Sequence, residues 1–274
     1  MTIEKILMHN YRKINFEVMT DTKQKYETLP ELKMAVDYSM AHQYMVAHEE
    51  NIAYLRVTEN NTIYKVTDHR SFEAARQYKG KEVAVLNFAN NHSIGGAPFY
   101  AGAQEESLCR CSTLLPCLEA MREPFYQKHI RQNREGEIGF MGNDDLIYTP
   151  DVVVFKTDGI VNGLVLPEMM PMEEWYKVNV ITCAAPELQD EDEIPADYDE
   201  QLTSRIKKIL DVAAKERNEV LILGAWGCGA FENPADIVAR VFHKVLKNYD
   251  FELVEFAIGA KDNENYNVFS NVFD

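Results

Sequence analysis

The sequence predicts an α/β fold in which a mixed, mostly parallel sheet carries helices on both faces. Short apolar runs rich in β-branched residues recur along the chain, at residues 82–88, 151–155, 176–183, 219–223 and 252–257. Helical patterns stand between them, over residues 105–122, 198–216 and 234–247. Buried strands that alternate with helices are typical of such a sheet, and ligands bind beyond the carboxyl ends of its strands.

The chain before the first of these strands has helical patterns. Residues 31–50 predict one helix, because their apolar residues lie four apart: Leu32, Val36, Met40 and Tyr44. Residues 70–79 predict a second helix, with Ser71 as its N-cap. We therefore expect an N-terminal helical extension over residues 1–80, packed on a core of residues 81–274 in one structural unit.

Composition limits the classes of partner. The 274 residues are 46% hydrophobic and 26% charged, which fits a packed protein, and the net charge of −16 argues against a broad nucleic-acid-binding surface. A small anion remains possible, because backbone N–H groups can hold a phosphate without side-chain charge. No segment predicts a membrane span or a signal peptide, so the cytoplasm is the expected location. Oligomeric state is left open.

Cysteine and histidine spacing predicts no bound metal. The five cysteines form no paired CxxC motifs, so neither a disulfide framework nor a zinc site is indicated, and we expect reduced thiols. The seven histidines stand singly, without metal-ligand spacing. We expect no metal and no cofactor. His92 alone lies in a candidate site loop, where it is a weaker candidate for substrate contact.

The loop after the first core strand is the first candidate site. Gly95 and Gly96 allow a close backbone approach to a ligand, although a glycine pair also suits a simple turn. Gln104, Glu105 and Glu106 then open a predicted helix, where the helix dipole favours acidic residues. A carboxyl shielded there from water has a raised pKa and can donate a proton to a leaving oxygen, while its neighbour holds ribose hydroxyls.

A second glycine-rich loop follows the strand at residues 219–223. Gly224, Gly227 and Gly229 precede a predicted helix that Asn233 is expected to cap. Several backbone amides around one concavity can hold a phosphate. Cys228 is expected to matter for its small size, because no histidine is placed by sequence to activate it as a nucleophile.

Together these motifs resemble the poly(ADP-ribose) glycohydrolase family. The chain reads LNFAN, then GGA, six residues and QEE, whereas the usual family signature is GGG, six to eight residues and QEE. Further segments resemble the microbial-type branch of that family: ESLCRCSTLLPCL, IYTPDVVVF, ITCAAPEL and LGAWGCGAFENP. The resemblance runs from about residue 10 to residue 258, and it implies a three-layer, macrodomain-like fold.

The resemblance also implies roles for the site residues. Glu106 would be the catalytic proton donor and Glu105 would bind or orient the ribose that is cleaved. The implied substrate-binding residues are Asn90, Gly95, Gly96, Ala97, Gln104, Gly227, Cys228, Gly229, Ala230 and Phe231. In this reading Gln104 fixes the loop, Asn90 lies near the distal ribose, and Phe231 packs against the terminal ribose. One departure is Ala97, which replaces the third glycine of the signature and so could restrict the backbone or crowd a diphosphate.

The predicted function is therefore a hydrolase that cleaves O-glycosidic ADP-ribose linkages and releases ADP-ribose, which would reverse ADP-ribosylation. The expected ligand is ADP-ribose or poly(ADP-ribose) on a modified acceptor. One alternative removes single ADP-ribose groups from protein or nucleic-acid acceptors. Another is a non-catalytic ADP-ribose-binding module, which the missing third glycine favours and the two retained acids disfavour. A nucleotide-binding protein unrelated to ADP-ribosylation would require both loops to coincide by chance.

Overall fold

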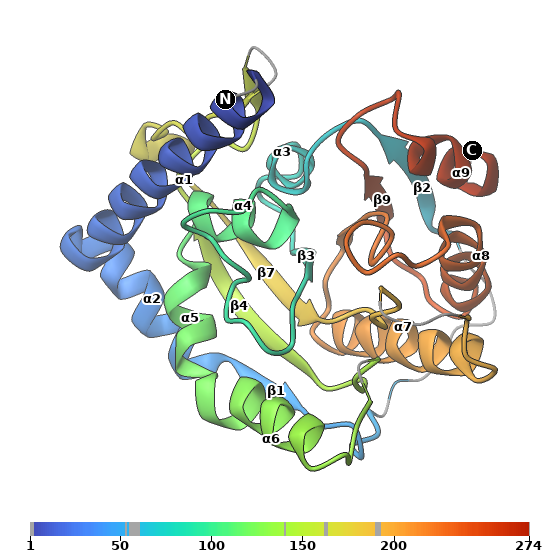
Figure 1. The fold of residues 1–274 in the computed structure, drawn as a ribbon. Coiled ribbons are helices and arrows are strands. Elements are labelled where there is room, and N and C mark those ends of the chain that lie inside the picture. Colours follow the sequence, from blue (N-terminus) through green and yellow to red (C-terminus); the bar gives the residue numbers. More distant parts are fainter. Residues whose placement is uncertain are drawn as a thin grey trace.

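The computed structural model describes residues 3–52, 54, 61–139, 141–161, 164–189 and 193–273. Its centre is a seven-stranded sheet with the order β1-β4-β7-β3-β8-β9-β2 (Figure 1). The strands are β1 (Tyr44–Val46), β2 (Ile63–Thr67), β3 (Val83–Phe88), β4 (Leu146–Val154), β7 (Tyr176–Cys183), β8 (Val220–Leu223) and β9 (Leu253–Ala257). A separate two-stranded ribbon joins β5 (Ile160–Val161) to β6 (Leu164–Val165).

The sheet is mixed and mostly parallel, as predicted. β7, β3, β8, β9 and β2 run parallel to one another, whereas β4 pairs antiparallel with both β7 and β1. All five strands predicted from apolar runs are present. The run at 176–183 matches β7 at both ends, while β4 begins earlier than predicted and contains a bulge between Thr149 and Val152.

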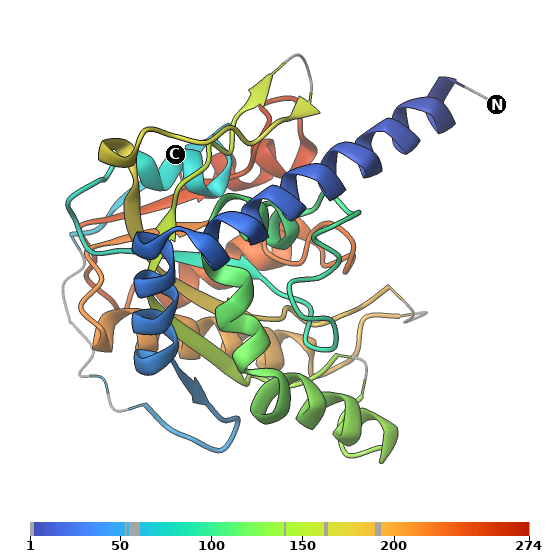
Figure 2. The same ribbon diagram turned by 90° about the vertical axis from the view of Figure 1, so that its left-hand side faces the viewer.

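Helices cover both faces, so the fold has three layers. One face carries α1 (Ile3–Thr28), α2 (Pro30–His42), α3 (Ser71–Arg76), α4 (Gln104–Cys111) and α5 (Leu114–Ala120). The other carries α7 (Tyr198–Lys215), α8 (Ala235–Leu246) and α9 (Glu264–Phe273). A π-helical segment (Arg122–Gln127), α6 (Lys128–Arg134) and a short 3₁₀ helix (Met172–Glu174) complete the elements. Figure 2 shows α1 crossing the first helical layer, with its N-terminal end projecting from the body.

The side chains of β3 belong alternately to two hydrophobic cores, one on each face of the sheet. Val83 and Val85 pack with the layer of α1 to α5, whereas Ala84 and Leu86 pack with α7 and α8. Successive side chains of a strand point to opposite faces, so a strand buried on both faces is a continuous apolar run. The same pattern in the other parallel strands explains why the sequence identified them.

The N-terminal part differs from the helical extension predicted over 1–80. The helix predicted to run through residue 50 ends at His42, and Tyr44 begins β1, which pairs with the edge of β4. Met40, predicted to lie on the buried stripe, is 40% exposed. This part also supplies β2, which pairs with β9 at the other edge. A boundary near residue 80 stays a prediction, but residues before it belong to both edges of the sheet.

The single helix predicted over 105–122 is two helices, α4 and α5. Ser112 is extended and forms a bridge with Val154, and the Thr113 N–H donates to the carbonyl of Val153 at 3.0 Å. Pairing with the end of β4 therefore interrupts a sequence whose local pattern is helical throughout. This contact between distant segments was not visible in the sequence.

Among the described residues, no helix combines the length and apolar character needed to cross a bilayer. The five cysteines are free thiols.

Candidate active site

A cavity of about 540 Å³ lies beyond the carboxyl ends of β3, β8 and β9. The loop of residues 89–103 forms one wall and the loop of residues 224–234 forms another. Residues that follow β9, among them Ile258, Gly259 and Asn263, close the far end. This is the edge at which the sheet topology predicted a ligand site. The cavity is of the size that small-molecule ligands occupy in proteins.

Glu105 and Glu106 lie on the first turn of α4 and both line the cavity. They are 3% and 7% exposed. Glu105 accepts hydrogen bonds at both oxygens, from Asn87 Nδ2 at 3.1 Å and from the Asn90 backbone N–H at 3.0 Å. Glu106 accepts one, at Oε1 from the Ala97 N–H at 3.1 Å, while its Oε2 is buried without a hydrogen-bond partner in the described structure.

The pKa of Glu105 is raised to about 8, chiefly by burial and also by the charge of Glu106, against the lowering effect of the hydrogen bonds from Asn90 and Asn87. Burial disfavours the charged form of a carboxyl group. Glu105 therefore retains its proton near neutral pH. The site therefore holds a proton available for transfer.

Gln104 fixes the start of α4 against β3. Its Oε1 accepts from the Phe88 N–H at 2.9 Å, and its Nε2 donates to the Leu86 carbonyl at 2.8 Å and to Ser71 Oγ at 3.0 Å. Ser71 is the first residue of α3 and not its N-cap as predicted, since Arg70 holds that position. The two carboxyls follow directly, so this bridge sets where they enter the cavity.

The glycine pair allows the loop to pass over the carboxyls. Gly96 has φ +67°, and a Cβ built there would lie 2.9 Å from Glu106 Cδ and closer still to Oε1. Gly95 has φ +65° and packs against Cys109 and Leu115, outside the lining of the cavity. Ala97 is exposed and is not among the residues with positive φ, so the third signature glycine is not required by backbone conformation here.

Behind this loop, Arg110 is 1% exposed and donates from Nη1 to the carbonyls of Pro98 at 2.8 Å and Ala101 at 2.7 Å. From α1, Asn15 Nδ2 donates to the same Ala101 carbonyl at 3.0 Å. The chain between Gly96 and α4 is thus held from two sides. The N-terminal helix belongs to the support of the first loop.

Asn90 shapes the turn that starts the loop. Its Oδ1 accepts from the backbone N–H groups of His92 and Ser93, both at 2.8 Å. Asn90 lines the cavity, whereas His92 lies in a neighbouring one. Asn87 is buried and does not line the cavity; it contributes through its hydrogen bond to Glu105.

Asn233 does not cap α8 as predicted; its side chain instead holds the second loop together. Asn233 Nδ2 donates to the carbonyls of Pro186 at 2.7 Å, Gly227 at 3.0 Å and Phe231 at 3.3 Å. The N-cap position of α8 is Pro234 instead. Gly227 has φ +77°, and a Cβ there would meet Ala185 and Asn233. The loop therefore needs glycine at this position.

The predicted residues of the second loop lie in different places. Gly227, Gly229, Ala230 and Phe231 line the cavity and Cys228 does not. Burial raises the pKa of the Cys228 thiol to about 12, so it is not a thiolate nucleophile at neutral pH. Trp226 also lines the cavity; its side chain is buried and donates from Nε1 to the Cys183 carbonyl at 3.1 Å, which ties the loop to the end of β7.

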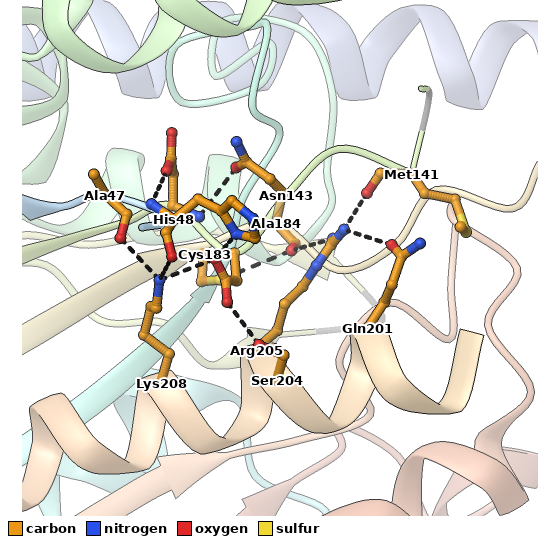
Figure 3. A network of polar contacts seen from close by, with 12 residues as sticks. Ala47, His48, Met141, Asn143, Cys183, Ala184, Gln201, Ser204, Arg205 and Lys208 are labelled. Carbon is orange, nitrogen blue, oxygen red and sulfur yellow. Dashed lines mark hydrogen bonds and ion pairs between the residues drawn. The ribbon is translucent and has the colours of Figure 1, made fainter. Parts of the chain in front are cut away.

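A polar network joins α7 to the chain after β7 and to the chain after β1 (Figure 3). Arg205 of α7 is 1% exposed and donates to the carbonyls of Ala184, at 3.0 Å, and Met141. Lys208, one turn on, donates to the Ala47 and His48 carbonyls, both at 2.9 Å. The Arg205 bond to Ala184 holds the chain after β7, where the next residue, Ala185, lines the cavity.

Sequence reasoning missed one polar pair of the cavity. Arg70 Nε donates to Asp158 Oδ1 at 3.0 Å, and Ser107 Oγ donates to the same oxygen at 2.6 Å. Both Arg70 and Asp158 line the cavity, and Asp158 is 5% exposed. The two residues are 88 positions apart and stand in no motif, so no signal in the sequence paired them.

Within the described ranges, no group of three or more His, Cys, Asp or Glu side chains is placed to hold a metal ion. The cavity instead presents the two adjacent carboxyls of Glu105 and Glu106, the Arg70–Asp158 ion pair, backbone amides and apolar walls. This arrangement suits acid-assisted cleavage of a bound, largely neutral ring with a phosphate held by backbone groups.

Comparisons with known proteins agree with this geometry. A family model described as the catalytic domain of microbial-type PARG matches residues 17–157, which include the first loop and both carboxyls. A crystal structure of poly(ADP-ribose) glycohydrolase from Thermomonospora curvata is 28% identical, with a TM-score of 0.79, over 97% of this chain and 100% of that one. The same organism's enzyme bound to the inhibitor ADP-HPD has a TM-score of 0.77 at 28% identity, over 96% and 99%.

The poly(ADP-ribose) glycohydrolase of Deinococcus radiodurans, solved in complex with ADP-ribose, is 29% identical with a TM-score of 0.68, over 86% of this chain and 95% of that one. A search of curated proteins returned no match.

Proposed function

The chain belongs to the microbial-type poly(ADP-ribose) glycohydrolase family, and from this premise we propose that it hydrolyses the O-glycosidic bond between ADP-ribose units with Glu106 as the proton donor. It is a hydrolase of the glycosidase class with a macrodomain-like α/β fold. Its substrate is a poly(ADP-ribose) chain. It releases the terminal ADP-ribose unit and leaves the chain one unit shorter.

The observation that carries the proposal is the unequal bonding of the two carboxyls. Both oxygens of Glu105 accept N–H donors, whereas Glu106 keeps Oε2 buried and without a partner in the described structure. An unpaired buried oxygen is costly unless a ligand group satisfies it. A leaving oxygen that accepts a proton from Glu106 is such a group. Glu105 is held to orient ribose hydroxyls.

The reaction then follows from these positions. Glu106 transfers its proton to the leaving oxygen as the bond from that oxygen to the anomeric carbon breaks, and an oxocarbenium-like ribose forms. Water attacks the anomeric carbon and returns its proton to the Glu106 carboxylate. The two carboxyls are adjacent and do not face each other across the sugar, so the spacing rule of ordinary glycosidases gives no stereochemistry here.

The loops supply the binding contacts. The diphosphate lies against backbone groups from Gly96–Ala97 on one side and Gly227–Ala230 on the other, because these segments line facing walls of the cavity. Phe231, which lines the cavity beside them, packs against the terminal ribose. Asn90 lies near the same ribose through its place in the first loop.

The test compares Glu106→Gln with the native protein on poly(ADP-ribose). We expect release of ADP-ribose to fall by about 10²- to 10⁴-fold, with ADP-ribose affinity retained in calorimetry, because only proton transfer is lost. Glu123→Gln, an exposed glutamate outside the lining of the cavity, is the matched control. Binding by the native protein without release from polymer would instead identify a binding module.

A further inference from the structure

A second cavity, of about 400 Å³, borders the loop that covers the two carboxyls. Ser93, Gly96 and Ala97 line both cavities, so the two cavities border the same stretch of chain. The Ala97 N–H is the group that hydrogen-bonds Glu106. A glycosidic bond protonated by Glu106 therefore lies beside the stretch of chain that both cavities border.

Exposed aromatic rings stand at the second cavity. Phe99 and Tyr100 line it, and Tyr100 is 55% exposed. Phe16 of α1 is 46% exposed and stacks on Tyr100, with ring centroids 6.1 Å apart and an angle of 29° between the planes. Clustered exposed aromatics are uncommon without a ligand, and every nucleic acid base offers a face that stacks on such rings.

A cationic side chain also lines the second cavity. Arg122, which is exposed, lines it together with His92 and Glu119. Burial lowers the pKa of His92 and the nearby His129 lowers it further, so Arg122 supplies the positive charge at neutral pH. A guanidinium group pairs well with phosphate oxygens. In a chain with a net charge of −16, a cation beside exposed aromatic rings matches a nucleoside diphosphate.

We propose that this second cavity binds the ADP-ribose unit on the leaving side of the cleaved bond, with its adenine on Tyr100 and Phe16 and a phosphate at Arg122. The inference rests on the proposed function, since it requires the terminal ribose to be cleaved beside Glu106. It makes the polymer the preferred substrate. An ADP-ribose with a small leaving group fills only the first cavity.

The kinetic test uses Tyr100→Ala and Arg122→Ala on two substrates, poly(ADP-ribose) and ADP-ribose that carries 4-nitrophenol at the anomeric carbon. We expect kcat/KM on polymer to fall about tenfold in each variant, while kcat/KM on the nitrophenyl substrate stays within about twofold. Comparing variant with native protein on each substrate removes the difference in leaving-group reactivity. Tyr38→Ala and Arg134→Ala, exposed residues outside both cavities, are the controls.

Equal losses on both substrates, or no loss on polymer, would overturn the subsite. A binding experiment separates this result from failure of the proposed function. In the Glu106→Gln background, an ADP-ribose dimer should bind about tenfold more tightly than ADP-ribose, and Tyr100→Ala should remove that gain. Equal affinity for dimer and monomer rejects the subsite even if the native protein turns nothing over. Absence of release from polymer by the native protein, with the gain for dimer present, rejects only the hydrolase.

Discussion

The Cα of Gly96 lies directly against the carboxyl group of Glu106, so that a Cβ on Gly96 would be 2.9 Å from Glu106 Cδ. Gly96 also has φ +67°, a conformation that side chains with a Cβ rarely adopt. The glycine thus sets the position of the proposed proton donor as well as the path of the loop. Gly96 therefore constrains the position of the Glu106 carboxyl even without a ligand.

Gly96→Ala should reduce kcat on poly(ADP-ribose) by about 10²-fold or more, because a carboxyl displaced by about 1 Å no longer reaches the leaving oxygen. The measurement is a steady-state rate, with thermal unfolding recorded alongside. Gly139→Ala is the control, since that glycine has ordinary φ and no neighbour within 4 Å of an added Cβ. Equal rates for Gly96→Ala and native protein would mean that the carboxyl has freedom to move.

Ala97→Gly restores the usual signature and should change kcat/KM on polymer by less than about threefold. Ala97 is exposed and lies outside the residues with positive φ, so glycine relieves no backbone strain. The measurement is kcat/KM on poly(ADP-ribose) for Ala97→Gly and for the native protein. A rise of tenfold or more would show that the methyl group itself obstructs the diphosphate.

Glu105 should make stability depend on pH. Its pKa is about 8 in the folded protein and ordinary when unfolded, so the folded state binds the extra proton in between. The stability that protonated Glu105 contributes to the folded state is fully present below the unfolded pKa and is lost as the pH rises through about 8. The free energy of unfolding of Glu105→Gln and of the native protein is measured with denaturant across this range. The difference, variant minus native, should rise by a few kcal/mol between about pH 5 and about pH 9. A difference independent of pH would show that ionising Glu105 costs nothing.

The sequence specified the central strands because a strand buried on both faces is apolar throughout, as in β3 and β7. It did not reveal β2, a sheet-edge strand in which Ile63 is 57% exposed and Lys65 also faces solvent. Edge strands lack the pattern that identifies buried ones. The helical extension predicted over residues 1–80 includes α1, but no periodic pattern marked this helix, because its polar character hides buried residues such as Met19.

The same distinction holds in the site. Gln104, Glu105 and Glu106 are adjacent in the chain and open a helix, so their shared position was predictable. Arg70 and Asp158 meet only because α3 and the chain after β4 pack around α4, and no local pattern records that contact. The caps predicted at Ser71 and Asn233 were wrong for a related reason. Both side chains are used in contacts between loops and neighbouring elements.

Asn233 should control ligand affinity more than the chemical step. Its side chain joins three carbonyls of the second loop and the segment after β7, while its Oδ1 accepts from the Tyr198 hydroxyl at 2.8 Å. Asn233→Ala removes the side-chain donor from all three carbonyls, although those of Gly227 and Phe231 keep a backbone donor, and it loosens Gly227–Phe231 without touching Glu106. We expect ADP-ribose affinity to fall by about tenfold or more in calorimetry, with kcat at saturating polymer reduced by less than about threefold.

Tyr198→Phe is the graded comparison, because it removes only the hydrogen bond to Asn233 Oδ1 and keeps the buried ring. Its affinity should lie between that of the native protein and that of Asn233→Ala. If Asn233→Ala lowered kcat as much as affinity, the second loop would act in the transition state as well as in binding, and the division between a binding loop and a catalytic loop would have to be abandoned.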